Sequence, residues 1–374
     1  MLHETSREKY FPSLKNQVYL NTAAEGIPPP TVEKALQQYF HHKSLGMDGR
    51  DFHFKELDAL KTTVSKMLGF SPEEIAVCSC SSEAFNLAAL ALNLQEGDEV
   101  VINDLDFPAG ATPWLQPHFR GKTRIWKARD WALHTEDLLP LLGEKTQLVT
   151  LSLVSFFNGF KINLQETVAA IRQRSDALIA VDVTQALGRI SFNLADIDLV
   201  VSSTHKWILG PHGGGLVAVP EKKAARWVVP AGGWFHLKDA FGPERFQRAE
   251  SKPGAAGFSV GMPNFPAIYA TRAAVDFISE VGVANIEKAA NPLVEMAYQG
   301  VQKFGVEMLL PPGENRRAGI FAFRHPNADR IHASLKAQNI HLMHQAGRLR
   351  VAIHGYNTVK DVESFLAALA KEVR

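Results

Sequence analysis

The sequence predicts an α/β protein with a large, mostly parallel sheet and a smaller α+β domain in its C-terminal part. The chain has 374 residues, a length that suits about two domains. Short apolar runs alternate with amphipathic stretches from residue 71 to about 220, which is typical of strands that alternate with helices. After about residue 230 this alternation gives way to glycine-rich loops, two long helical segments and a mixed pattern.

The first of these regions contains the predicted sheet. Apolar runs of strand length occupy residues 74–80, 99–103, 147–155, 177–183, 198–204 and 215–219. Residues 82–92 and 164–172 have helical spacing, and the first of these helices begins with a serine and an early acid, as helix N-termini do. Apolar strands separated by helices predict a sheet that is covered on both faces. Ligands of such sheets bind at the carboxyl ends of the strands.

The second region predicts the smaller domain. Helical segments at 266–281 and about 285–304 are followed by strands at 320–323 and 349–353 and by helices at 328–338 and 359–373. We therefore expect a large domain over residues 16–262. Residues 263–374, together with 1–15, are expected to form the small domain.

Composition excludes several classes of protein. The chain is 46% hydrophobic and 21% charged with a net charge of +1, so no strong field favours nucleic acid or a membrane surface. The first ten residues contain acids and no apolar segment, and we expect no secretory signal. Cys78 and Cys80 alternate along one predicted strand, which offers no disulfide framework and favours a cytoplasmic location. Histidine and cysteine spacing predicts no metal site.

Two polar segments at predicted strand ends carry the chemistry. Lys206 ends the apolar run that begins at residue 198, which is a poor place for a solvated lysine. Burial lowers the pKa of an amine, as a lysine that forms a Schiff base requires; the alternative is a lysine whose aliphatic stem lies along the strand end. Asp182 follows the apolar residues 178–181, so it is either a buried partner for a cationic group or a loop cap.

A third segment suits an anion. Ser81, Ser82 and Glu83 lead from a predicted strand into a predicted helix, whose N-terminal amides can bind phosphate. Plain helix capping is the alternative. The sequence has no Walker motif and no Gly-x-Gly-x-x-Gly, the usual fingerprints of nucleotide binding.

Asp182-x-x-Gln185 followed by Ser203-x-His205-Lys206 resembles the pyridoxal-phosphate site of class V aminotransferases, the family of cysteine desulfurases, selenocysteine lyases and isopenicillin N epimerase-like proteins. The resemblance runs from about residue 17 to the C-terminus. It implies the fold-type-I architecture, a seven-stranded sheet in the large domain, the cofactor pyridoxal 5′-phosphate, and a homodimer with the site at its interface. An amino acid is the implied substrate.

The resemblance also implies a role for each candidate residue. Lys206 would form the Schiff base and move the proton, with Asp182 beneath the ring nitrogen and Gln185 at the phenolate oxygen. Phe107 would stack on the ring, where cysteine desulfurases usually place a histidine. The residues implied at the phosphate are Ser81, Ser82, the amide of Glu83, Ser203 and His205.

Two further segments carry the resemblance in the part of the site that binds the substrate. Residues 350–358, Arg-Val-Ala-Ile-His-Gly-Tyr-Asn-Thr, are similar to the family segment whose arginine binds the substrate carboxylate. Arg350 is at the position of this carboxylate-binding arginine. Arg348 would lie on the same face of the strand, so the choice between the two arginines stays open. The segment Tyr-Leu-Asn-Thr-Ala-Ala at 19–24 is similar to the family's opening segment at the site mouth, which implies that Asn21 touches substrate.

Three departures from the family pattern refine the expected activity. Residues 338–347 lack the loop cysteine of cysteine desulfurases, so we expect no persulfide-forming desulfurase. Met262 replaces a threonine that reaches the neighbouring subunit's phosphate, and Phe156 replaces an asparagine beside the cofactor. We expect an aminotransferase. The alternatives are a cysteine-sulfinate or selenocysteine lyase, an amino-acid epimerase, and a non-catalytic protein that binds pyridoxal phosphate or another phosphate ligand.

Overall fold

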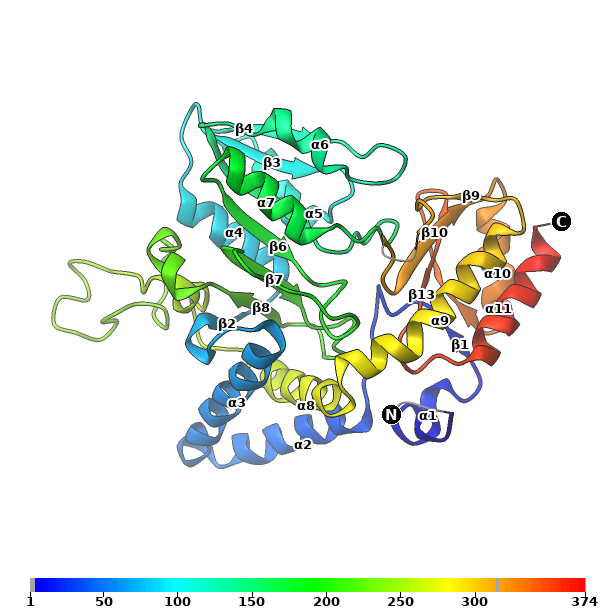
Figure 1. Ribbon diagram of the computed structural model, residues 1–374. Helices are drawn as coiled ribbons and strands as arrows, with labels where there is room; N and C mark the ends of the chain where they lie inside the picture. Colours follow the sequence, from blue (N-terminus) through cyan, green and yellow to red (C-terminus); the bar gives the residue numbers. More distant parts are fainter. Residues whose placement is uncertain (1–3, 314–315, 374) are drawn as a thin grey trace.

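The computed structural model describes residues 4–313 and 316–373, and a seven-stranded sheet lies at its centre (Figure 1). The order of the strands is β2-β8-β7-β6-β5-β3-β4. Neighbouring strands from β7 to β4 are parallel, whereas β8 runs antiparallel to both β7 and β2. The strands are β2 (Ile75–Cys78), β3 (Glu99–Asn103), β4 (Lys122–Trp126), β5 (Thr146–Ser152), β6 (Leu178–Asp182), β7 (Leu199–Ser203) and β8 (Gly215–Ala218). The predicted mostly parallel sheet is confirmed.

Helices cover both faces of this sheet because its strands are apolar on both sides. Leu148 and Leu178 pack in a core with Phe85 of α4 (Ser81–Leu92), whereas their neighbours Val149 and Ile179 pack with α7 (Leu164–Arg174) on the opposite face. The other helices of this part are α2 (Pro30–Ser44), α3 (Arg50–Leu68), α5 (Pro108–Ala111), α6 (Thr135–Leu138) and α8 (Phe265–Val281). Helix α8 packs against α2 and α3.

The C-terminal part is a second, smaller α+β unit. Its antiparallel sheet has the order β12-β13-β10-β9, and a separate parallel pair joins β1 to β11. Its elements are β1 (Val18–Tyr19), α9 (Val283–Gln302), β9 (Glu307–Met308), β10 (Ile320–Arg324), α10 (Ala328–Ala337), β11 (Ile340–His341), β12 (Met343–Gln345), β13 (Arg348–Ala352) and α11 (Val359–Glu372). The expected division into residues 16–262 and 263–374 with 1–15 stays a prediction.

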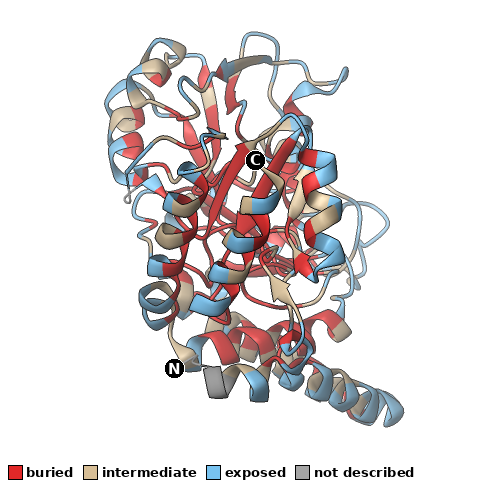
Figure 2. Cartoon of the chain, turned by 90° about the vertical axis from the view of Figure 1, so that its right-hand side faces the viewer, coloured by how far each residue is buried: buried red, intermediate tan, exposed pale blue. Residues whose placement is uncertain are grey.

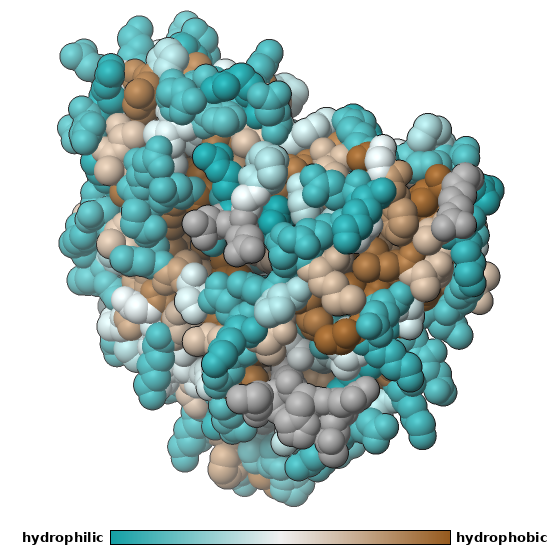
Figure 3. Space-filling model, turned by 45° about the vertical axis from the view of Figure 1, so that its right-hand side comes forward, coloured by the Kyte–Doolittle hydropathy of each residue, from teal (hydrophilic) through white to brown (hydrophobic). Residues whose placement is uncertain are grey.

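Short 3₁₀ helices complete the secondary structure. They lie at Pro12–Leu14, Gly46–Gly49, Pro72–Glu74, Thr112–Leu115, Leu139–Leu141, Glu221–Arg226 and Gly254–Phe258. Figure 2 shows buried strands at the centre and helices whose exposed faces point outward. Hydrophilic side chains predominate on the face drawn in Figure 3, with hydrophobic ones in small patches between them. No helix within the described ranges has the length and apolarity that a membrane crossing requires.

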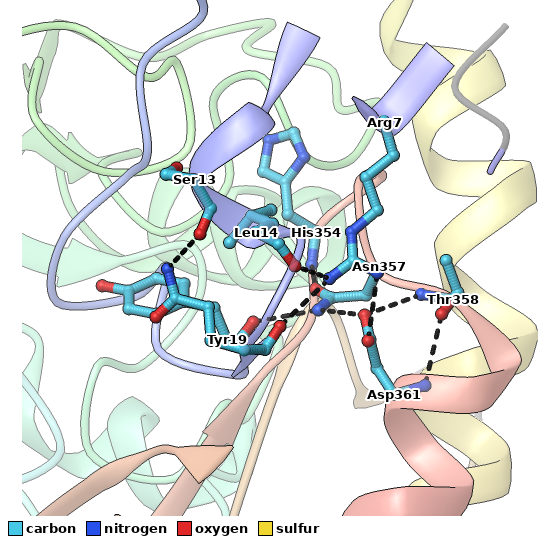
Figure 4. Close-up of polar contacts among 9 residues, drawn as sticks. Arg7, Ser13, Leu14, Tyr19, His354, Asn357, Thr358 and Asp361 are labelled. Carbon is cyan, nitrogen blue, oxygen red and sulfur yellow. Dashed lines mark hydrogen bonds and ion pairs between the residues drawn. The ribbon is translucent and has the colours of Figure 1, made fainter. Parts of the chain in front are cut away.

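A polar network fixes the N-terminal segment to the C-terminal part (Figure 4). Arg7 of α1 (Glu4–Tyr10) forms an ion pair with the nearly buried Asp361 at 3.2 Å and donates to the carbonyl of Leu14. Asp361 also accepts from the amide of Thr358, in a capping box that begins α11. Asn357 donates to the carbonyl of Tyr19, the last residue of β1. The chain that leaves β1 toward residues 21–26 therefore starts from a fixed point.

Candidate active site

The predicted cofactor residues gather around a cavity of about 160 Å³ at the carboxyl ends of β5, β6 and β7. Each of these strands ends in a polar residue, because the apolar run that pairs within the sheet stops there. Ser152 and Asp182 are register partners at the ends of β5 and β6, and Ser203 ends β7. The cavity is lined by Cys80, Ser81, Ser82, Phe107, Ser152, Phe156, Asp182, Thr184, Gln185, Ser203, His205 and Lys206.

Lys206 lies three residues beyond β7 and is 9% exposed. Burial lowers the pKa of its amine to about 8, with the charge of Arg350 acting in the same direction and that of Asp182 opposing it. Its Nζ lies 5.1 Å from the centre of the Phe107 ring. About a tenth of this amine is therefore unprotonated at pH 7, far more than for a lysine of ordinary pKa, as a nucleophilic lysine requires.

Asp182 is buried at the end of β6. It accepts a hydrogen bond from the amide of Thr184 at 2.7 Å. Burial raises the pKa of this carboxyl, while the contacts with Thr184 and the charge of Lys206 oppose that shift. A desolvated carboxylate of this kind has a strong preference for a cationic partner.

The opposite end of the cavity is lined with hydroxyls and helix amides. The hydroxyl of Ser203 donates to that of buried Ser81 at 2.9 Å, which joins the end of β7 to the first turn of α4. Amides in the first turn of a helix lack intrahelical acceptors and carry the positive end of its dipole. Burial, followed by the charges of Lys206 and His212, lowers the pKa of His205 to about 4, so its imidazole is neutral near pH 7. Ser82 lies on the rim and is exposed.

Two aromatic rings form one wall. Phe107 is 38% exposed and meets Phe156 edge to face, with ring centres 5.0 Å apart. Because neither ring carries a proton donor, this wall can hold a flat ligand without taking part in acid–base chemistry.

Gln185 lines the cavity but is also held on both sides by protein. Its carbonyl accepts from the indole of Trp207 at 2.6 Å, and its amide nitrogen donates to the carbonyl of Ala23 at 3.1 Å. One N–H of this amide is left for a ligand.

The two arginines of β13 differ in how their donors are used. Arg348 donates to the carbonyl of Phe157 and to the backbone and side chain of Gln345. Arg350 donates to the carbonyl of Phe156 at 2.7 Å, but its buried Nε and Nη2 have no partner among the described residues. Burial, together with the charge of Arg348, lowers the pKa of Arg350 to about 9. The unused donors favour Arg350 as the carboxylate site.

Glu83 and Asn21, like Arg350, lie outside the cavity lining. The carboxylate of Glu83 accepts from the amide of Ser79 at 2.5 Å, so it holds the turn before α4. Asn21 forms a backbone bridge to Ala352 beside β13, and its buried side-chain oxygen has no partner among the described residues.

The structure adds residues that the sequence did not single out. Thr184 accepts from the amide of Ser203, and Ser152 donates to Asp106, whose carboxyl also accepts from Asn103 at 3.1 Å. Burial, with the nearby Asp182 charge, raises the pKa of Asp106 to about 7. Thr184 directly follows the predicted strand at 177–183, and that position was the signal available for it. Ser152 lies inside the predicted strand at 147–155 and carried no such signal.

Cys80 was placed wrongly by the alternating pattern. Strand β2 ends at Cys78, because its partner β8 begins at Gly215 and the ladder stops there. Cys80 instead precedes α4 as its N-cap residue, is exposed, and lines the same cavity as Lys206.

The fold and this site define an α/β enzyme of the pyridoxal-phosphate class. The buried lysine, the buried carboxylate and the helix N-terminus with two hydroxyls fit an aldehyde, a pyridine nitrogen and a phosphate respectively. The chain belongs to the class V aminotransferase family, whose profile matches residues 18–365. Membership of this family confirms pyridoxal 5′-phosphate as the expected cofactor.

Relatives with assigned names point to two activities. The chain is 25% identical over 364 residues to an uncharacterized aminotransferase, YcbU, of Bacillus subtilis, with 96% of this chain and 95% of that protein covered. It is 26% identical over 388 residues to a probable cysteine desulfurase of Methanothermobacter thermautotrophicus, with 94% of each covered.

Solved structures support the fold. The apo cysteine desulfurase of Thermococcus onnurineus NA1 has a TM-score of 0.89 at 21% identity and covers 100% of this chain and 98% of its own. The cystine C–S lyase C-DES, in complex with its product cysteine persulfide, has a TM-score of 0.87 at 20% identity and covers 96% and 99%. The predicted fold type I is confirmed.

The exclusion of a persulfide-forming cysteine desulfurase is wrong. Several relatives that match nearly the full chain are named as such enzymes, and desulfurase and C–S lyase structures share its fold. The exclusion assumed that both cysteines lie on a core strand, whereas Cys80 reaches the cavity.

Proposed function

We propose that the protein is a pyridoxal-phosphate enzyme that acts on an α-amino acid, and that its reaction is transamination. The assignment to a pyridoxal-phosphate enzyme rests on one observation: a buried lysine with a lowered pKa and a buried carboxylate line the same cavity. Bound pyridoxal phosphate would supply an electron sink that acidifies the substrate Cα–H bond.

The chain's own residues would divide the remaining work. Arg350 would bind the substrate carboxylate through Nε and Nη2, because a planar guanidinium matches two carboxylate oxygens. Lys206 would move the proton at Cα, because the aromatic wall of Phe107 and Phe156 has no group that can. Asp182 would stabilise positive charge at the deep end of the cavity.

A second candidate reaction is removal of sulfur from cysteine. Cys80 favours it, since an exposed thiol lines the cavity, and so do the names of the relatives. The two reactions leave different products. Transamination converts the amino acid to a 2-oxo acid and needs a second 2-oxo acid to turn over. Desulfuration of cysteine yields alanine, passes the sulfur atom to a thiol such as that of Cys80 as a persulfide, and needs no 2-oxo acid.

We also propose a homodimer with the site near its interface. Phe241 and Phe246 are 78% and 90% exposed in the segment that projects from the body of Figure 1, and Phe40 and Met47 are 66% and 73% exposed near the end of α2. Large apolar side chains that are exposed to this degree are typical of an interface. Light scattering should give twice the mass of the chain, and a monomer at micromolar concentration would contradict the dimer.

The reaction type can be tested with purified holoenzyme. We expect a yellow protein that turns amino acids into 2-oxo acids only when a second 2-oxo acid is present. Alanine formed from cysteine with no 2-oxo acid present, with the sulfur released as sulfide by an added thiol, and both products lost in C80S, would establish the second candidate instead. A colourless protein that takes up no pyridoxal phosphate would refute both.

A further inference from the structure

Glu25, His205 and His212 form a compact group at the mouth of the cavity. His212 Nε2 lies 2.9 Å from Oε2 and 3.1 Å from Oε1 of Glu25. The imidazole of His212 stacks on that of His205, with ring centres 4.2 Å apart and planes inclined by 21°. Of these three residues His205 lines the cavity, and His212 contacts it from outside the lining.

Glu25 is fixed from two sides. The amide of its neighbour Gly26 donates to the carbonyl of His205 at 2.8 Å, and the carbonyl of Glu25 accepts from the hydroxyl of Tyr19 at 2.9 Å. A Cβ at Gly26 would lie 2.0 Å from the carbonyl oxygen of Lys206, so only glycine permits this approach.

The loop that carries His212 is fixed independently. Thr204 donates to the carbonyls of Pro211 at 2.6 Å and of Gly214 at 3.0 Å, and the side chain of Asn264 donates to that of Gly213 at 3.0 Å. Contacts from the segments that contain Gly26, Thr204 and Asn264 therefore hold the stacked imidazoles of His205 and His212 in place. Such preorganisation reduces the entropy that a binding site loses when its ligand arrives.

The charge balance at this end of the cavity indicates what the group does. A phosphate monoester carries a charge of about −1.5 to −2 at pH 7. Within the described lining the basic side chains are His205 and Lys206. Lys206 is committed to the covalent bond and His205 is neutral near pH 7, so a basic group in contact with His205 would add positive charge that the lining itself lacks. His212 is the imidazole in contact with His205.

We propose that His212, held by Glu25, is a positioning residue that orients His205 toward the cofactor phosphate and contributes positive charge there. This inference rests on the proposed function. It offers a replacement within the same chain for the threonine that Met262 displaces, because the Asn264 contact ties that segment to the His212 loop.

A metal site is the competing explanation. Among the residues that the structure describes, these three form the cluster whose ligand atoms lie within 4.8 Å of one another. Nearly parallel stacked rings, however, point their nitrogen lone pairs side by side, whereas a tetrahedral ion needs them directed at one point.

The test compares two ligands that differ only in the phosphate. Dissociation constants of pyridoxal phosphate and of pyridoxal are measured spectroscopically with the apo form of the full chain. The same measurement is made on the variants H212N, H212R and E25Q, and on H118N as the control at an exposed histidine. We expect H212N to weaken pyridoxal phosphate about three- to fivefold, in line with an exposed charge pair, and to leave pyridoxal unchanged. E25Q should weaken the binding of pyridoxal phosphate less than H212N does. H212R should bind pyridoxal phosphate as tightly as the wild type, because a guanidinium is charged and stacks on flat rings.

Two outcomes would overturn the inference. Equal weakening of both ligands by H212N would mean a purely structural role, and no change in either would mean no role. If the wild-type chain binds neither ligand, the proposed function itself fails, so the two failures are distinguishable.

Discussion

At the inner end of the cavity Asp182 and Lys206 are 6% and 9% exposed, whereas at its mouth the side chains of Glu25 and His212 are 56% and 67% exposed. Both ends pair a carboxylate with a basic group. Water and salt screen the outer pair, but the inner pair interacts through protein of low polarity. The same chemistry is therefore expected to shift pKa values and reaction rates strongly inside and to adjust ligand affinity modestly outside.

The largest effect should follow from neutralising the inner carboxylate. D182N removes the buried charge at the end of β6 but keeps the shape of the side chain, and we expect activity to fall by about 100-fold or more. Steady-state rates check this, with D176N as the control at an exposed aspartate. Wild-type rates in D182N would mean that Asp182 caps a loop and nothing more.

The next effect distinguishes the two arginines of β13. R350Q removes the unpartnered donors, so we expect KM for the amino acid to rise roughly 10- to 100-fold with the fold intact. R348Q instead breaks contacts with Phe157 and Gln345, and we expect a Tm lowered by about 2–4 °C with a smaller change in KM. If R348Q has the larger effect on KM, the assignment is reversed.

The pH dependence of cofactor uptake tests the lowered pKa of the Lys206 amine separately from the other residues. Its pKa is lowered to about 8, so the unprotonated fraction grows as pH rises and is nearly complete above pH 9. We expect the rate of pyridoxal-phosphate binding by the apo form to rise about tenfold per pH unit below 8 and to level off above it. A rise that continues to pH 10 would show that burial does not perturb Lys206.

The smallest effect is the three- to fivefold change predicted for H212N. Raising the salt concentration should shrink it further, because the outer pair is exposed. A change in H212N as large as that in D182N would remove the distinction between the two ends.

The sequence predicted the residues at the inner end of the cavity, Asp182 and Lys206, but not the contact between Glu25 and His212 at its mouth, and the reason is physical. Asp182 and Lys206 follow apolar runs, and burial of those runs places them at adjacent strand ends. Strand β4 was missed because Trp126 is its one buried residue, so its pattern lacks an apolar run. Cys80 was misplaced because strand length depends on where the partner strand begins. The contact between Glu25 and His212 joins segments 187 residues apart, which periodicity cannot reveal.

Reduction of the holoenzyme with borohydride, followed by mass spectrometry of its peptides, tests the central role of Lys206 most directly. We predict a reduced cofactor attached to the peptide that contains Lys206, and no attachment in K206A. An unmodified Lys206 peptide, or a cofactor fixed to a different lysine, would contradict it.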